Sequence, residues 1–212
     1  MDFKAVAFDV DGVITDIESI WRFIHQELNT LKIAEKNAKL YYSGKITYEE
    51  WALLDAGLWK GVSYEKMANI VRKIPLKDGL KELTSFLKAR GLRIFAISAG
   101  LDLLREPLYR EAFFDEFLAN KLIIKNGKVT GEVEVHVTVE NKGEILEKLC
   151  LKYGFSPIHV IAVGDSEVDI PMFRKAGLSI AFNPNKLEVA KEADVALYGD
   201  LIKLLAFFRK IL

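Results

Sequence analysis

Hydrophobic and polar positions along this 212-residue chain follow two different periods. Apolar runs that are too short for helices, at residues 5–8, 92–97 and 159–163, are typical of buried strands. Between residues 16 and 74, apolar residues instead recur every three or four positions, as they do on one face of an amphipathic helix. The pattern therefore predicts an all-helical segment inside a chain that otherwise combines strands and helices.

The all-helical segment contains signals for successive helices. They are expected over residues 17–31 and 35–42, from residue 47 onward, and over residues 63–73. Thr47 and Glu50 form the Thr-x-x-Glu pattern of a capping box, which marks a helix start. We therefore expect a helical cap domain, residues 16–74, inserted into a core domain that is made of residues 1–15 and 75–212.

From residue 77 onward the chain alternates between helices and strands. Strands are expected over residues 92–97, 159–163, 178–182 and 194–197, and helices over residues 141–153, 167–176 and 200–210. A β-hairpin is expected over residues 122–135, because Asn126-Gly127 is a favoured pair for a tight hairpin turn. Alternating strands and helices form a parallel sheet that is covered on both faces. The prediction is an α/β fold: a Rossmann-like three-layer parallel sheet core with an inserted helical cap and a small β-hairpin.

Two carboxylates lie at the carboxyl end of the first predicted strand. Asp9 and Asp11 flank Val10, so their side chains point to the same side of an extended backbone. Gly12 lets the chain leave the strand sharply. Like charges this close need a metal ion, a shared proton or strong donors. Because Asp-x-Asp triplets are also common in turns, the rest of the chain has to decide between a turn and a site.

Polar residues follow the other predicted strands as well. Ser98 follows the strand at 92–97, Asp165 follows the strand at 159–163, and Lys142 begins a predicted helix. Carboxyl ends of parallel strands share one edge, where open α/β sheets bind ligands, so we expect these groups to converge. Carboxylates can hold Mg²⁺, while a hydroxyl, a lysine and backbone N–H groups can hold phosphate oxygens. The pattern predicts a site for phosphoryl transfer.

The stretches that carry this chemistry follow one another in a recognisable order. They are Phe8-Asp9-Val10-Asp11-Gly12, Ser98-Ala99-Gly100, Asn141-Lys142-Gly143-Glu144 and Gly164-Asp165-Ser166-Glu167-Val168-Asp169. In this order, and over nearly the whole chain, they resemble the haloacid dehalogenase superfamily, and within it the phosphoserine phosphatase-like branch. The resemblance implies a Mg²⁺-dependent phosphatase that hydrolyses a small phosphomonoester through an aspartyl phosphate.

The resemblance also implies a role for each site residue. Asp9 would be the nucleophile, and Asp11 would be the general acid and base. The metal ligands would be Asp9, Asp11 through its backbone carbonyl, and Asp165, and Asp169 would support the metal waters and the lysine. The phosphate would be bound by Ser98, Ala99, Gly100 and Lys142. Glu18 matches a family glutamate that meets the substrate's amino group, although an acid there also suits a helix N-terminus.

One departure from the family's pattern concerns the substrate. The family places an arginine that binds the substrate carboxylate in the stretch from Trp51 to Trp59, but this stretch holds none, and Asp55 lies about where it would be. A carboxylate that faces a carboxylate is repulsive, so we expect L-phosphoserine to be a poor substrate. The aromatic residues Trp21, Tyr41, Tyr42, Trp51 and Trp59 are expected to form the core of the cap, and the scattered histidines are assigned no role.

The motifs leave other functions open. A phosphotransferase such as a sugar-phosphate mutase needs Asp11 equally, so the motifs do not exclude it. A receiver-like phospho-acceptor also carries a phosphorylated aspartate, but the cap and Asp11 argue against it. A dehalogenase fits the motifs less well, because its chemistry does not need a second acid at the position of Asp11.

Composition narrows the partners and the location. Lys plus Arg and Asp plus Glu each number 30, so the charge balance implies neither nucleic acid nor an acidic membrane surface as a partner. The small-molecule phosphomonoester substrate is what the resemblance implies. No unbroken apolar stretch approaches the roughly 18 residues of a membrane span. The single cysteine, Cys150, indicates a reducing, cytoplasmic location. Both a monomer and a homodimer fit the sequence.

Overall fold

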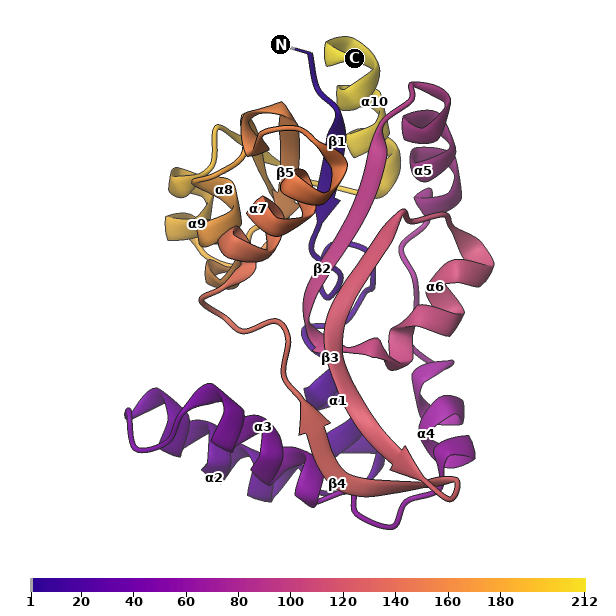
Figure 1. The fold of residues 1–212 in the computed structure, drawn as a ribbon, viewed down its shortest axis with the longest axis vertical. Coiled ribbons are helices and arrows are strands. Elements are labelled where there is room, and N and C mark those ends of the chain that lie inside the picture. Colours follow the sequence, from indigo (N-terminus) through magenta and orange to yellow (C-terminus); the bar gives the residue numbers. More distant parts are fainter. Residues whose placement is uncertain (1) are drawn as a thin grey trace.

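A seven-stranded sheet with the order β4-β3-β2-β1-β5-β6-β7 forms the centre of the structure, a computed structural model that describes residues 2–212 (Figure 1). The strands are β1 (Ala5–Phe8), β2 (Arg93–Leu101), β3 (Glu116–Lys125), β4 (Lys128–Glu134), β5 (Val160–Gly164), β6 (Leu178–Phe182) and β7 (Val195–Leu197). All neighbours pair in parallel except β3 and β4. The predicted α/β sheet is confirmed.

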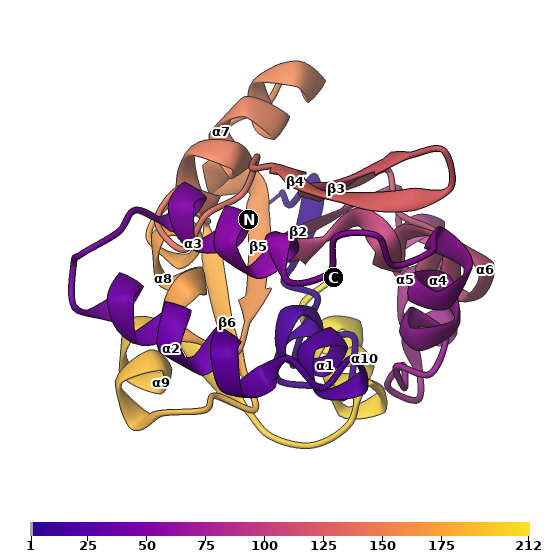
Figure 2. The same cartoon turned by 90° about the horizontal axis from the view of Figure 1, so that it is seen from below.

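Helices cover both faces of the sheet. They are α5 (Leu80–Ala89), α6 (Arg105–Glu111), α7 (Lys142–Tyr153), α8 (Ile170–Phe173), α9 (Leu187–Glu192) and α10 (Leu201–Ile211), with short 3₁₀ turns at Asp102–Leu104, Pro157–His159 and Glu167–Asp169. Seen from below, β5 and β6 run between α8 on one side and α10 on the other (Figure 2). No helix within residues 2–212 combines the length and the apolar character that crossing a membrane requires.

The first strand divides the interior into two apolar cores. Val6 and Phe8 pack into the core shared with α5 and α10, whereas Ala5 and Ala7 pack into the core shared with α7, α8 and α9. All four residues of β1 are at most 1% exposed. A strand that is buried on both faces has an unbroken apolar sequence, which explains why β1 was visible in the sequence. Its central position places the residues that follow it in the middle of the sheet's carboxyl edge.

The helical segment lies at the lower end of the molecule in Figure 1. Its helices are α1 (Ile20–Glu27), α2 (Leu31–Tyr42), α3 (Tyr48–Gly57) and α4 (Tyr64–Val71). Thr47 and Glu50 form the predicted capping box at the start of α3. The single helix that we expected over residues 17–31 is wrong, because Asn29 adopts a left-handed backbone (φ 57°) and separates α1 from an α2 that begins four residues earlier than expected.

Backbone hydrogen bonds tie the two ends of the helical segment to each other. Thr15 and Leu76 form an isolated antiparallel bridge. Beside this bridge, Asp16 N donates to Pro75 O at 2.9 Å. The chain therefore leaves the sheet and returns to it at one point. The division into a core of residues 1–15 and 75–212 and a cap of residues 16–74 stays a prediction.

The expected hairpin over residues 122–135 proves to be part of the main sheet. β3 begins at Glu116 and pairs in parallel with β2, and only its second half pairs with β4. The hairpin reaches the helical segment, where Tyr64 N donates to Gly127 O at 2.8 Å and Gly61 N donates to Val129 O at 2.8 Å. The first half of β3 was missed because the polar Asn120 interrupts its apolar pattern, although that side chain is fully buried.

Two further element boundaries differ from the prediction. β2 continues to Leu101, past the expected end at residue 97, with an irregular register after Ile97. The helix expected over residues 167–176 is a 3₁₀ turn followed by the short α8, and it ends before Gly177. A Cβ at Gly177 would lie 1.8 Å from Ile158 O, so the backbone turns here to pack directly on its neighbour.

Candidate active site

The two carboxylates after β1 are held by different partners. Asp9 is 6% exposed, and its Oδ1 accepts a hydrogen bond from Val10 N at 2.7 Å. Asp11 Oδ2 accepts a hydrogen bond at 2.9 Å from Ile20 N, the first residue of α1. Burial raises the pKa of Asp11 to about 6, and the Ile20 N–H offsets only part of this effect. Asp11 is therefore attached to the helical segment and can hold a proton near neutral pH.

Lys142 lies between two of the predicted acids. It is the first residue of α7 and is 1% exposed. Its Nζ lies 2.8 Å from Asp9 Oδ1 and 2.7 Å from Asp169 Oδ1. Burial alone would lower the pKa of Lys142, but the carboxylates of Asp169 and Asp9 raise it above its usual value. The lysine therefore carries a fixed positive charge in a buried site.

Three acids converge beside this lysine. Asp9, Asp165 and Asp169 each offer a carboxylate oxygen, and these oxygens all lie within 4.8 Å of one another. Burial, followed by the Asp169 carboxylate, raises the pKa of Asp9 well above its usual value and the pKa of Asp165 to about 7. One lysine does not compensate three carboxylates. The cluster has the charge and the oxygen donors of a cation site.

Asp169 also binds the backbone of the turn that follows β5. It is fully buried, and its Oδ2 accepts hydrogen bonds from Asp165 N at 3.0 Å and Ser166 N at 3.1 Å. A Cβ at Gly164 would lie 2.3 Å from the Asp169 carboxyl carbon, so only glycine fits beside it. Asp169 therefore fixes both the turn that carries Asp165 and, through its other oxygen, the ammonium of Lys142.

Gly12 is required beside Asp165. Its φ of +79° favours glycine, and a Cβ at this position would lie 2.3 Å from Asp165 Oδ2. Lys77 Nζ donates to the Gly12 carbonyl at 2.5 Å and so holds the loop after β1 in place. No sequence signal pointed to Lys77, because its partner is a backbone atom 65 residues away.

The segment Ser98-Ala99-Gly100 lies inside β2 rather than after it. Ser98 is 1% exposed, and its Oγ accepts a hydrogen bond from Gly100 N at 2.9 Å. A Cβ at Gly100 would lie 2.7 Å from Ile20 Cγ2 and 3.1 Å from Asp11 Oδ2. The backbone of this segment therefore approaches the Asp11 carboxylate closely.

The carbonyl of Ala99 receives three hydrogen bonds. Trp21 Nε1 in α1 donates at 3.1 Å, and Tyr48 Oη in α3 donates at 3.0 Å. The third donor is Asn120 Nδ2 in β3, at 2.9 Å. Two helices of the predicted cap and one strand of the sheet thus meet at a single backbone atom of the segment predicted to bind phosphate.

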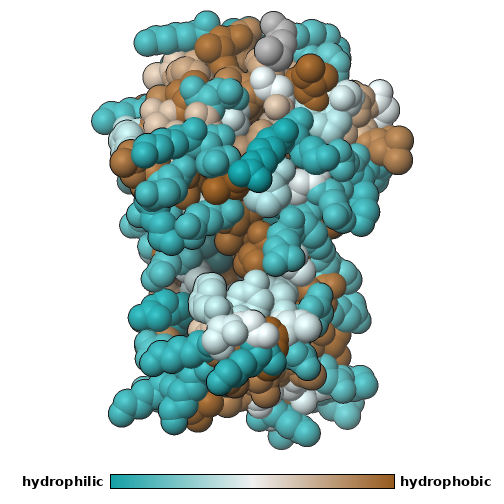
Figure 3. Space-filling view, turned by 90° about the vertical axis from the view of Figure 1, so that its left-hand side faces the viewer, coloured by the Kyte–Doolittle hydropathy of each residue, from teal (hydrophilic) through white to brown (hydrophobic). Residues whose placement is uncertain are grey.

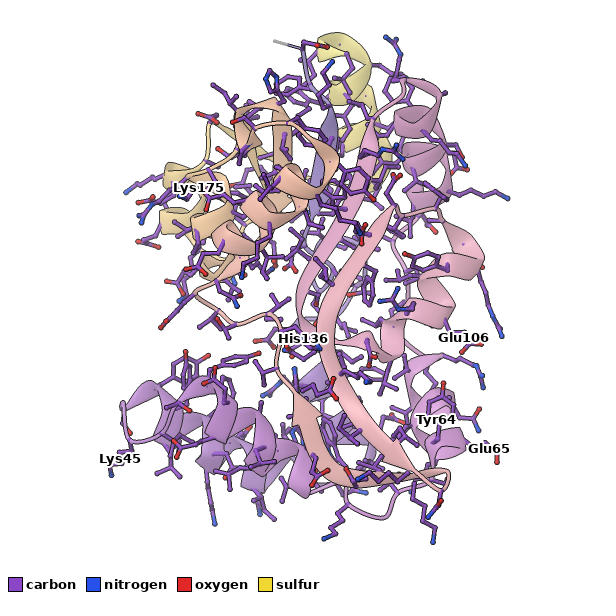
Figure 4. The ribbon with its side chains drawn as sticks, in the orientation of Figure 1. Lys45, Tyr64, Glu65, Glu106, His136 and Lys175 are labelled. Atoms are coloured by element: carbon purple, nitrogen blue, oxygen red, sulfur yellow. The ribbon has the colours of Figure 1, made fainter. Side chains whose placement is uncertain are left out.

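Asn120 is a site-supporting residue that the sequence reasoning missed. Its Nδ2 also donates to Val137 O at 2.9 Å, and its Oδ1 accepts from His136 N at 2.8 Å and Val137 N at 2.9 Å. Figure 4 places His136 near the point where β4 passes into the segment that leads to Lys142. Asn120 therefore fixes the Ala99 segment relative to the segment that precedes Lys142. A polar residue within an apolar strand run was the available signal.

A cleft of about 810 Å³ opens between the sheet edge and the helical segment, and Figure 3 shows that this face is hollowed between its upper and lower parts. Nearly all predicted site residues line it: Asp9, Asp11, Glu18, Ser98, Ala99, Gly100, Lys142 and Asp165. Asp169 is buried beneath the cleft. Glu18 is not part of the acid cluster; its side chain is 84% exposed and lies 3.7 Å from Arg22 Nε. The structure thus places every predicted site residue in or directly beneath one cleft, with Glu18 in its wall but outside the acid cluster.

The cap aromatics do not all form a core, contrary to the expectation. Trp59 is fully buried, but Trp21, Tyr42 and Trp51 line the cleft, and Tyr42 is 77% exposed. Helical periodicity shows that these residues share faces, but it does not show whether protein or a cleft covers those faces. His25, which was assigned no role, is 2% exposed and accepts a hydrogen bond from Trp59 Nε1 at 3.2 Å.

Asp55 lies at the cap side of the same cleft. It is 4% exposed, and its Oδ1 accepts a hydrogen bond from Asn37 Nδ2 at 2.8 Å. Its Oδ2 lies 3.4 Å from His25 Nε2. The cleft therefore has an acidic group on its cap wall as well as on its sheet edge.

The sheet, the inserted helices and the acidic cleft define a Rossmann-like hydrolase. The family model of haloacid dehalogenase-like hydrolases matches residues 3–177, and the chain belongs to this family. It is 34% identical over 208 residues to the phosphoserine phosphatase of Methanocaldococcus jannaschii, with 97% of this chain and 98% of that protein covered. It is 31% identical over 220 residues to the phosphoserine phosphatase of Albidiferax ferrireducens, with 98% and 90% covered.

Solved structures show the same similarity. A phospho-aspartyl intermediate analogue of phosphoserine phosphatase superposes with a TM-score of 0.82 at 32% identity and covers 98% of this chain and 99% of its own. A substrate-bound phosphoserine phosphatase complex gives the same TM-score, identity and coverage. The resemblance seen in the motifs is thereby confirmed over nearly the full length.

Proposed function

We propose that the protein is a Mg²⁺-dependent phosphatase that hydrolyses a small phosphomonoester through an aspartyl phosphate on Asp9. The observation that carries the proposal is the position of Lys142, buried between Asp9 and Asp169 at the floor of the cleft. A fixed ammonium beside a carboxylate attracts the phosphoryl group to that carboxylate. The relatives named phosphoserine phosphatase support the same reaction class.

The acid cluster fits Mg²⁺. Mg²⁺ is a hard cation that binds carboxylate and carbonyl oxygens and keeps several waters. Burial, followed by the Asp169 carboxylate, raises the pKa of Asp9 and of Asp165, and Lys142 offsets only part of this effect. A cation would favour the ionised form of both carboxylates. Asp9, the backbone carbonyl of Asp11 and Asp165 would hold it, with Asp169 behind them. When bound, the ion neutralises negative charge on the phosphoryl oxygens.

The remaining steps use the side chains of this chain. An Asp9 carboxylate oxygen attacks phosphorus and forms an acyl phosphate, while Asp11 gives its proton to the departing alkoxide. Asp11 then takes a proton from the water that hydrolyses the acyl phosphate, which restores both residues and releases inorganic phosphate. Burial suits Asp11 to both tasks, because a pKa of about 6 allows either protonation state near neutral pH.

The phosphate oxygens would be held by Lys142, the Ser98 hydroxyl and the backbone of Ala99 and Gly100. We further propose that Glu18, at the mouth of the cleft, contacts the leaving group rather than the phosphate, because it lies apart from the acid cluster. Cys150 is fully buried and unpaired, which supports a reducing, cytoplasmic location. Monomer and homodimer both fit this site.

Phosphate release with p-nitrophenyl phosphate and Mg²⁺ tests the proposal. Wild-type protein should turn over, and Asp9→Asn should abolish turnover while the far-UV circular dichroism stays unchanged. The matched control is Asp2→Asn, which makes the same change on an exposed side chain before β1 and should leave the rate unchanged. An Asp9→Asn variant with wild-type rates would overturn the assignment of the nucleophile.

The same assay separates the other candidate functions. A phosphotransferase would pass the phosphoryl group to an added alcohol or sugar instead of releasing inorganic phosphate. A receiver-like acceptor would keep a phosphorylated Asp9 for hours and release little product. Stoichiometric release of inorganic phosphate over many turnovers is the result that we expect from a hydrolase.

A further inference from the structure

Aromatic side chains cover the cap wall of the cleft. The residues that contribute them are Trp21 of α1, Tyr42 at the end of α2, and Tyr48 and Trp51 of α3. Tyr42 is 77% exposed, and the other three are partly exposed. A molecule in the cleft can therefore contact these rings.

Two of these rings lie beside the segment that is proposed to bind phosphate. Trp21 Nε1 and Tyr48 Oη both donate to the carbonyl of Ala99, at 3.1 Å and 3.0 Å. Tyr48 Oη also receives a hydrogen bond from Asn120 Nδ2 at 3.4 Å. Because the polar atoms of both side chains bind the protein itself, the rings offer mainly carbon surface to the cleft. An alcohol that is esterified to a phosphate at this segment would lie against ring carbons.

A second ring supports each tryptophan of this wall from behind. Trp21 stacks on the fully buried Trp59, with ring centroids 5.3 Å apart and 27° between the planes. Trp51 stacks on Tyr41, with centroids 4.7 Å apart and 19° between the planes. Within residues 2–212, neither Trp59 nor Tyr41 lines the cleft, so the two tryptophans lie between these rings and the cleft. Such a wall suits a flat ligand, because paired aromatic rings gain free energy beyond the burial of their area.

The cations of the cleft are already paired with acids of this chain. Within residues 2–212, the lysines and arginines that line the cleft are Arg22, Lys142 and Lys186. Each lies at most 3.7 Å from a carboxylate, and Arg22 lies between Glu18 and Glu35. A carboxylate on the leaving group would therefore have to displace one of these acids, whereas an uncharged leaving group would not.

We propose that Trp21, Tyr42, Tyr48 and Trp51 form a leaving-group subsite for an uncharged aromatic ring, so that the substrate is the phosphate ester of an alcohol that carries such a ring. The cleft volume of about 810 Å³ accommodates a ring beside a phosphate. Glu18 at the mouth of the cleft would then meet a hydroxyl carried by the ring. The inference rests on the proposed phosphatase function.

Phosphate esters that differ in the leaving group provide the test. Benzyl phosphate and cyclohexylmethyl phosphate carry six-carbon rings, flat in the first and puckered in the second. D-Glucose 6-phosphate carries a hydroxylated ring, and L-phosphoserine carries two charges and no ring. We expect kcat/KM to be highest for benzyl phosphate, about 2- to 10-fold above cyclohexylmethyl phosphate, and lowest for L-phosphoserine. Turnover of acetyl phosphate, which has no ring, measures the phosphatase function independently of this order.

Variants locate the preference on the cap wall. Tyr42→Leu removes an exposed ring and should lower kcat/KM for benzyl phosphate relative to acetyl phosphate by about 2- to 10-fold. Trp51→Leu should lower the same ratio at least as much, and Tyr42→Phe, which keeps the ring, should recover it. The matched control is Tyr198→Leu, the same change on a 62% exposed side chain that follows β7 and does not line the cleft within residues 2–212. It should leave the ratio unchanged.

Binding gives a second measurement that does not depend on turnover. In wild-type protein, quenching of tryptophan fluorescence should show tighter binding of benzylphosphonate than of cyclohexylmethylphosphonate, and Tyr42→Leu should reduce this difference. A preference for L-phosphoserine or D-glucose 6-phosphate over benzyl phosphate, or a ratio that both Tyr42→Leu and Trp51→Leu leave unchanged, would overturn the subsite. Absence of acetyl phosphate turnover in the wild type would instead overturn the phosphatase proposal, and the order of phosphonate binding would still decide the subsite.

Discussion

Asn120→Ala is the substitution that most directly tests how this site is held together. The wild-type side chain donates to the carbonyls of Ala99 and Val137 and accepts from the N–H groups of His136 and Val137. Alanine removes all of these bonds at a position that is fully buried. The main-chain groups of the Ala99 segment and of the segment before Lys142 would lose their common partner.

The magnitude follows from the groups left behind. Each buried donor or acceptor without a partner costs ~1–3 kcal/mol. Val137 is fully buried, whereas the backbone of the exposed His136 can find water. We therefore expect the free energy of unfolding to fall by roughly 3–5 kcal/mol, a large share of the ~5–15 kcal/mol that stabilises a typical domain. The midpoint of thermal unfolding should fall by about 10 °C.

Urea unfolding followed by circular dichroism measures the loss of stability, and phosphatase assays measure the loss of geometry. We expect KM for the phosphate ester to rise and kcat to fall, because both the Ala99 segment and Lys142 contact the phosphate in the proposed function. Asn69→Ala is the control, since Asn69 is exposed and its side chain bonds only to Arg72 within residues 2–212. It should change stability by less than ~0.5 kcal/mol.

The reasoning is refuted if Asn120→Ala loses less than ~1 kcal/mol of stability and keeps wild-type kinetics. Such a result would mean that the segments around Ala99 and Val137 are fixed by other contacts. A large loss of stability with unchanged kinetics in the folded fraction would restrict the role of Asn120 to the fold.

Further predictions concern the acid cluster and the buried thiol. Gly12→Ala should weaken activation by Mg²⁺ by about tenfold or more in a metal titration, because its Cβ would lie 2.3 Å from Asp165 Oδ2; an unchanged titration curve would contradict this. Chelation with EDTA should stop phosphate release. In denaturant titrations, Mg²⁺ at about 100 times its Kd should raise the free energy of unfolding by about 2.7 kcal/mol. An unfolding midpoint that does not change with Mg²⁺ would count against a cation at these acids. Burial raises the pKa of the Cys150 thiol to about 11, so Ellman's reagent at about pH 8 should react only after unfolding, and rapid reaction of the native protein would disagree with the structure.

The parts of the fold and site that could be predicted from the sequence share a physical cause. The run before Asp9 is unbroken because β1 is buried on both faces, and the chemistry follows directly where that run ends. Asp165 and Lys142 were found for the same reason, since strand ends and helix starts are marked by abrupt changes of residue type. Once several strands are parallel, their carboxyl ends must share an edge, so the convergence needed no coordinates.

The parts that could not be predicted depend on contacts between distant residues. Asn120 looks like an interruption of a strand, and only the fold shows that its partners lie on segments far apart in the chain. Helical periodicity placed Trp21 and Trp51 on apolar faces, but whether such a face meets protein or a cleft is decided by tertiary packing. The break at Asn29 was missed because the apolar stripe continues across a left-handed residue.

The hydrogen bond from Ile20 N to Asp11 links the proposed general acid to the inserted helices. Any movement that withdraws α1 from the sheet edge also removes the donor that aligns the Asp11 carboxyl group. An enzyme with its entrance wide open would thus lack a correctly aimed acid for the leaving alkoxide. If Asp11 is the general acid, its alignment thus depends on how the inserted helices sit on the sheet edge.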